Sequence, residues 1–81
     1  MIRVLLFGRL ADVAGWRERT VDPAPATLAA LRTRIEAEFP NLAEALAAKG
    51  VQAAVNKAIV RGDVALASGA EVAFLPAMSG G

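Results

Sequence analysis

The chain opens with a short run of hydrophobic residues, interrupted by one charged position, that predicts a β-strand. Residues 2–7 are β-branched, aliphatic or aromatic apart from one arginine, and they end at a glycine, which is typical of a strand. A second, more polar strand is predicted over residues 17–22, after a connection over residues 9–16. The two strands are expected to pair as a long-looped hairpin, which two prolines then end.

The apolar spacing changes to a helical period after Thr27. Over residues 28–39 apolar side chains recur three or four positions apart, and charged side chains fill the other faces. This pattern predicts an amphipathic main helix. Thr27 is placed to cap its N-terminus, and Pro40 is expected to end it.

A second, shorter helix is predicted over residues 42–49. Asn41 and Glu44 have the spacing of a capping pair at its start. Gly50 follows its end, where helices often take a left-handed residue.

Three short strands are predicted in the remaining sequence. Residues 51–55 and 58–61 flank Asn56 and Lys57, where asparagine suits the unusual backbone of a tight turn. A turn at residues 68–69 leads into a final strand over residues 71–75, which the next residue, a proline, ends.

The order of these elements favours an α+β domain, because the helices are grouped between two sets of strands. One main helix covers a single face of a sheet. If that face receives Ile2, Val4, Leu6, Val60, Val72 and Phe74, alternation leaves four large apolar side chains on the other face, namely Leu5, Phe7, Ile59 and Leu75. Such a surface is large enough to bind a partner. The alternative is that the strand phase is inverted, or that a loop covers this face.

Composition narrows the chemistry. The chain has 81 residues, no Cys, no His and a net charge of +1. It therefore offers no thiol nucleophile, imidazole base, disulfide or soft metal site. The interspersed charges argue against nucleic acid or an anionic membrane as a partner. No segment has the length of a signal peptide's apolar stretch or of a membrane span, so we expect a cytoplasmic protein with no metal site.

The chain ends in Gly80 and Gly81. Neither residue has a Cβ, so the terminal carboxylate can enter a narrow channel in another enzyme's active site. Without Cys or His, the Gly81 carboxylate is the most credible reactive group, and another protein must activate it. We expect one domain over residues 1–76 and a flexible C-terminal tail over residues 77–81.

Several segments make the chain resemble the small, sulfur-carrier subunits of molybdopterin synthase over essentially its whole length. They are Ile2 to Phe7, Phe7 to Gly15, Thr27 to Leu31, Ala54 to Asn56, and Gly69 to Pro76 leading to Ser79-Gly80-Gly81. These subunits are ubiquitin-like proteins. The resemblance implies a β-grasp fold, with a mixed sheet and both the main helix and the second short helix on one face.

The resemblance also implies a reaction cycle. A ubiquitin-activating-like adenylyltransferase would use ATP to adenylate the Gly81 carboxylate, and a persulfide sulfur donor would convert the adenylate into a thiocarboxylate. The sulfur would then pass to cyclic pyranopterin monophosphate, to form the molybdopterin dithiolene. In this cycle the chain is a non-catalytic sulfur donor that binds no cofactor, and the catalytic residues belong to the large subunit.

The partner contacts follow from the same resemblance. The large subunit is expected to bind the apolar sheet face and the tail, and Gly80 to allow access to the channel. The binding residues would be Phe7, Ile59, Leu75, Pro76, Met78 and Ser79. Two carriers would bind a large-subunit dimer to form a heterotetramer. The activating enzyme is expected to use an overlapping surface, so the two partners would exclude one another.

Two other functions share the Gly-Gly terminus. One is the sulfur carrier of the thiamine pathway, and the other is a ubiquitin-like protein modifier joined through Gly81 to lysines of its targets. A catalytic domain built on a carboxylate pair is a weaker alternative. Its candidate residues, Asp12, Glu36, Glu38 and Glu44, are explained as solvated loop and helix positions.

Overall fold

The computed structural model describes residues 1–77, which form a five-stranded sheet and three helices. The strands are β1 (Ile2–Leu6), β2 (Glu18–Val21), β3 (Gln52–Val55), β4 (Ala58–Val60) and β5 (Glu71–Leu75). The helices are α1 (Arg9–Ala14), α2 (Leu28–Glu38) and α3 (Pro40–Ala47). The α+β class and the predicted order of strands and main helices are confirmed.

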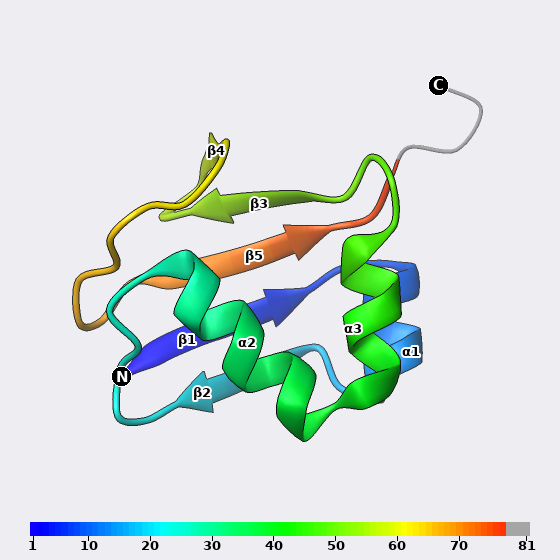
Figure 1. The fold of residues 1–81 in the computed structure, drawn as a ribbon, viewed down its shortest axis with the longest axis horizontal. Helices are drawn as coiled ribbons and strands as arrows, with labels where there is room; N and C mark the ends of the chain where they lie inside the picture. The colour runs from blue at the N-terminus through cyan, green and yellow to red at the C-terminus, as the bar shows by residue number, and fades with distance from the viewer. Residues whose placement is uncertain (78–81) are drawn as a thin grey trace.

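The sheet is mixed, with the order β2-β1-β5-β3-β4 (Figure 1). The first and last strands, β1 and β5, lie side by side at its centre and run parallel. The other neighbouring strands run antiparallel, including the predicted β1–β2 hairpin. Because β5 lies between β1 and β3, the C-terminal end of the domain emerges from the middle of the sheet.

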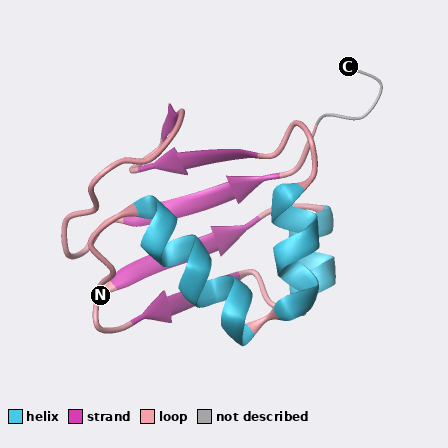
Figure 2. Cartoon of the chain, in the orientation of Figure 1, coloured by secondary structure: helices cyan, strands magenta, loops and turns pink. Residues whose placement is uncertain are grey.

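Helices α2 and α3 cover one face of this sheet, as Figure 2 shows. The core lies between the two layers, and its largest fully buried side chains are Phe74, Ile2, Leu31, Leu42, Val4 and Val72. The apolar stripe of α2 buries Leu28, Leu31 and Ile35. The strand phase predicted for β1 and β5 is therefore correct, and no buried polar or charged residue occurs among the described residues.

The N-terminus of α2 has two side-chain caps. Thr27 Oγ1 accepts a hydrogen bond from the backbone N–H of Ala30 at 3.1 Å, as predicted. Asp63 Oδ1 accepts a second from Ala29 at 2.8 Å. These acceptors satisfy two of the backbone donors that the first turn of a helix leaves unpaired.

The turn between β3 and β4 has the predicted conformation. Asn56 and Lys57 both have positive φ angles, 50° and 72°, as a type I′ hairpin turn requires. The Asn56 side chain accepts a hydrogen bond from the backbone N–H of Glu71 at 3.0 Å. This bond connects the turn to the start of β5.

The connection predicted over residues 9–16 instead contains α1. The short helix buries Leu10 and Ala11 and packs against α3. It ends at Gly15, which has a φ of 84° and whose N–H donates to the Ala11 carbonyl. A six-residue helix is too short to show a clear hydrophobic period, so the glycine at its C-terminus was the available signal.

The second predicted helix starts earlier than expected. Pro40 not only follows α2 but is also the first residue of α3, and no side chain caps this helix. The predicted capping pair of Asn41 and Glu44 is therefore wrong. Proline lacks the N–H that a first turn leaves unpaired, and its fixed φ already suits a helix. Gly50 has a positive φ, but it lies in the turn before β3, beyond the C-cap residue Ala48.

Candidate functional site

The sheet face opposite the helices carries a row of residues that crosses all five strands. Each neighbouring pair is in register, and the row runs Glu18, Leu5, Ala73, Ala54, Ile59 from β2 to β4. In-register residues on one sheet face have adjacent side chains. Four of the five are apolar, so the middle of this face is a continuous apolar surface.

Phe7 and Leu75 extend this surface beyond the row, toward the C-terminal end of β5. Phe7 is 47% exposed and Ile59 is 48% exposed, while Leu5 and Leu75 are half-buried. We call this surface the outer patch, and it consists of Leu5, Phe7, Ile59 and Leu75 with Ala54 and Ala73. The prediction that these four large side chains share the face away from the helices is confirmed, and the alternative of an inverted strand phase is wrong.

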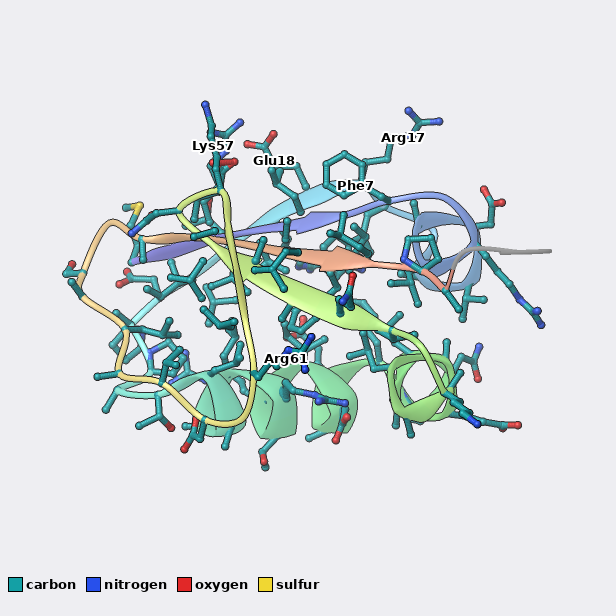
Figure 3. The ribbon with its side chains drawn as sticks, turned by 90° about the horizontal axis from the view of Figure 1, so that it is seen from above. Phe7, Arg17, Glu18, Lys57 and Arg61 are labelled. Atoms are coloured by element: carbon teal, nitrogen blue, oxygen red, sulfur yellow. The ribbon has the colours of Figure 1, made fainter. Side chains whose placement is uncertain are left out.

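Charged side chains surround the outer patch. Arg3 donates to Glu18 through Nε at 2.8 Å and through Nη2 at 3.2 Å. This two-point hydrogen bond, with the charge attraction, raises the pKa of Arg3 and lowers the pKa of Glu18. Figure 3 shows Phe7, Arg17, Glu18 and Lys57 projecting away from the helices.

A shallow open hollow adjoins Phe7, and its lining combines apolar and charged residues: Leu5, Leu6, Phe7, Gly8, Asp12, Arg17 and Glu18. The sequence did not predict this hollow, because it forms only when the end of β1 and the start of β2 lie side by side. A second hollow lies on the helix side, where Arg61 of the segment after β4 approaches α2 (Figure 3).

Pro76 and Ala77, which we call the root of the C-terminal segment, lie next to the outer patch. The backbone N–H of Phe7 donates to the Phe74 carbonyl at 3.3 Å, just beyond the last β1–β5 register pair. Pro76 follows and is half-buried, and Ala77 is exposed. The outer patch and the start of the tail thus form one continuous region at this end of the sheet.

Four of the predicted site residues lie outside the described residues. They are Met78, Ser79, Gly80 and Gly81, so their roles, and those of the whole tail, stay predictions. The binding roles of Phe7, Ile59, Leu75 and Pro76 also stay predictions, although these side chains lie where a common partner would reach them.

Two acidic residues of the carboxylate-pair alternative lie beside arginines. Glu36 is 3.9 Å from Arg32, and Glu38 is 3.4 Å from Arg19. Within residues 1–77 no group of three metal-ligating side chains is close enough to hold a metal ion. In the same range, no helix has the length and apolar character needed to cross a membrane.

Known proteins that resemble this chain in sequence or structure include small carriers and modifiers of similar length. The molybdopterin synthase sulfur carrier subunit of Escherichia coli is 37% identical over 81 residues, which is the whole of both chains. Small archaeal modifier protein 1 (SAMP1) of Haloferax volcanii superimposes with a TM-score of 0.84 at 28% identity, covering 99% of this chain and 98% of its own.

A structure from Pyrococcus furiosus, described as a putative molybdopterin converting factor, subunit 1, has a TM-score of 0.80 at 26% identity. It covers 95% of this chain, and 97% of its own length is matched. A family model, described as the ThiS family, matches residues 4–81, which include both the outer patch and the Gly-Gly terminus. With this match and a full-length relative at 37% identity, the chain belongs to the ThiS family.

Proposed function

We propose that this chain is the sulfur-carrier subunit of molybdopterin synthase and that its Gly81 carboxylate carries the sulfur. The observation that carries the proposal is the continuity of the outer patch with the root of the C-terminal segment at Pro76. A partner bound to the patch would be next to the tail, so one docking surface can serve every enzyme that acts on the terminus. The full-length likeness to the Escherichia coli carrier subunit supports the same function.

The activation chemistry would proceed on a partner, because the chain has no Cys or His. A Gly81 carboxylate oxygen attacks the α-phosphorus of ATP, and pyrophosphate leaves. The terminal sulfur of a persulfide donor then attacks the acyl carbon of this adenylate and expels AMP. A thiol cleaves the resulting acyl disulfide, which leaves a thiocarboxylate on Gly81 and a disulfide on the donor side.

Delivery would use the large subunit of the synthase. The thiocarboxylate sulfur forms a C–S bond to a side-chain carbon of cyclic pyranopterin monophosphate as an oxygen substituent leaves that carbon. Water then hydrolyses the resulting thioester, which returns the Gly81 carboxylate and leaves the sulfur on the pterin. A dithiolene has two sulfurs and each terminus carries one, so two charged carriers are consumed for each product. We propose that two carriers bind a large-subunit dimer in the cytoplasm as a heterotetramer. The adenylyltransferase uses ATP, and the carrier itself binds no cofactor.

Removing Gly81 tests the proposal directly. The truncated chain should keep its circular dichroism spectrum, because the core ends with β5, but it should not be adenylated or loaded with sulfur. Extending the chain by one residue beyond Gly81 should have the same effect. Gly80→Ala should also be adenylated more slowly than wild type, because the added Cβ would clash with the walls of a channel that fits only glycine.

The measurements are ATP-dependent pyrophosphate release with the activating enzyme and the intact mass of the loaded carrier, in which sulfur replaces one oxygen. Wild-type chain assayed with the same preparation of activating enzyme is the control for enzyme activity. Normal sulfur loading of the truncated chain would contradict the proposal.

Protein modification is the second candidate function, and the likeness to SAMP1, which is named as a modifier protein, favours it. In that function Gly81 would form an isopeptide bond with lysines of target proteins. An epitope-tagged chain expressed in its own cells distinguishes the two. Conjugates that vanish when Gly81 is deleted would support modification, whereas a free carrier with a C-terminal thiocarboxylate would support sulfur transfer.

A further inference from the structure

Two glycines from distant turns touch the root of the C-terminal segment. Gly8 lies between β1 and α1, and a Cβ on it would be 3.0 Å from Cγ of Pro76. Gly50 lies between α3 and β3, and a Cβ on it would be only 2.8 Å from the Cβ of Ala77. In Figure 1 the last described residues run beside the α3–β3 loop, consistent with these contacts. We call Gly8 and Gly50 the glycine cradle.

A side chain does not fit at either position without a movement. A separation of 2.8 Å is well inside the ordinary contact distance between two carbon atoms. Gly50 is anchored in a tight turn between α3 and β3, with a φ of 90°. Ala77 is exposed and comes after the last strand, so it has the fewest constraints. An added methyl group at Gly50 would therefore displace Ala77 and redirect the chain that follows.

We propose that Gly8 and Gly50 are positioning residues that set the direction in which the C-terminal segment leaves the domain; this inference rests on the proposed function. Within residues 1–77, the atoms that a Cβ on these glycines would meet belong to Pro76 and Ala77 alone. The two glycines act through Pro76 and Ala77, whose path they leave open between the β1–α1 and α3–β3 turns.

The exit direction matters because the reacting group is close to its root. Four residues follow Ala77, and an extended chain spans at most about 3.6 Å per residue, so the Gly81 carboxylate lies within roughly 14 Å of Ala77. With the outer patch bound to an enzyme, a change of direction at Ala77 moves the carboxylate away from that enzyme's reacting atoms. Small misplacements of a reacting group can lower rates by about a hundredfold.

Gly69 is a matched control for backbone strain. Its φ is 89°, against 90° for Gly50, but a Cβ on Gly69 would have no atom within 4 Å. Substituting alanine at either position imposes a strained left-handed conformation on a residue with a side chain. Only the substitution at Gly50 adds a collision with the tail, so the two variants separate strain from misdirection.

Ala77→Gly provides the rescue. It removes the Cβ that lies 2.8 Å away and leaves the Ala77 Cα at 3.5 Å, an ordinary van der Waals distance. The Gly50→Ala/Ala77→Gly double variant keeps the strained turn but loses the collision. A defect caused by misdirection should therefore be reversed, and a defect caused by strain should remain.

The experiment compares wild type with Gly50→Ala, Gly69→Ala, Ala77→Gly and the double variant. Steady-state adenylation is measured with the activating enzyme, and thermal unfolding is measured on the same samples. For Gly50→Ala we expect kcat to fall at least tenfold while KM changes less than about threefold, since the outer patch is intact. Gly69→Ala should have a similarly lowered thermal midpoint but a wild-type kcat, and the double variant should regain most of the rate.

A structural measurement decides the inference independently of the enzyme. In wild type, nuclear Overhauser effects are expected between the Gly50 Hα protons and the Ala77 methyl group, and between the Gly8 Hα protons and the Pro76 ring. Absence of these contacts, an equal kcat loss in Gly69→Ala, or no rescue in the double variant would overturn the inference. A wild-type chain that shows these contacts but is not adenylated would instead overturn the proposed function.

Discussion

Phe7 and Ile59 each expose nearly half of their surface on the sheet face away from the helices. Leu75 lies on the same face but is half-buried. A substitution at Leu75 would therefore change both the free domain and any complex. Ile59 is a cleaner position for a binding test because much of its side chain contacts only solvent in the free domain.

Ile59→Glu should weaken binding to the large synthase subunit at least tenfold, which is about 1.4 kcal/mol. The substitution removes an apolar contact and places a charge that must lose water in the interface. Ala37→Glu, at an exposed position on α2, adds the same charge away from the outer patch and should bind like wild type. Isothermal titration calorimetry gives the affinity, and thermal unfolding checks the fold. Equal affinities for the two variants would show that the large subunit does not use the outer patch.

At the scale of elements, α1 follows β1 at the end of the sheet from which the C-terminal segment leaves, and it packs into the core there. Its Leu10 is 2% exposed, and the helix packs against α3. A loop without structure would bury little at this position. The burial of Leu10 therefore makes α1 part of the core, although it has only six residues.

Leu10→Ala should lower the free energy of unfolding by about 2–5 kcal/mol, the range for truncating a buried leucine. Val13→Ala, at a half-buried position in the same helix, should cost clearly less. Urea unfolding followed by circular dichroism measures both. A loss below about 1 kcal/mol for Leu10→Ala would mean that α1 contributes little to the core.

At the scale of the whole molecule, helices cover one face of the sheet and leave the other bare. The outer patch adjoins Pro76 and Ala77, from which the C-terminal segment continues. An activating enzyme and a large subunit would therefore both need the same side of the domain. Simultaneous binding would require one of them to reach the tail without the patch.

The large subunit should therefore inhibit adenylation by sequestering the carrier, which is the substrate of the activating enzyme. Raising its concentration should increase the apparent KM of the activating enzyme for the carrier and leave kcat unchanged. The control is large subunit that is already saturated with carrier lacking Gly81 but retaining Ile59. The binding surface of this large subunit is occupied, so it cannot bind further carrier. Adenylation at an unchanged apparent KM, with carrier fully bound to the large subunit, would contradict a shared surface.

Local sequence signals were sufficient for much of the fold. Alternation in residues 2–7 and 71–75 divided the side chains into two sets, one of which was assigned to the core, because successive strand residues point to opposite faces. With residues 58–61 included, it also predicted the four large apolar side chains of the outer patch, but not its two alanines, Ala54 and Ala73. The period of α2 and its Thr27 cap were recognisable because both depend on residues within one or two turns.

By itself, then, the sequence determined the strands, the main helix, the bare apolar face and the Gly-Gly terminus, all of which are expressed in short-range patterns. Only the tertiary structure decided that β5 lies between β1 and β3, that residues 9–14 form a packed helix, and that Gly8 and Gly50 meet Pro76 and Ala77. Those contacts join residues that are far apart in the sequence. No local pattern encodes them, because they exist only once the strands have paired and the helices have closed over the core.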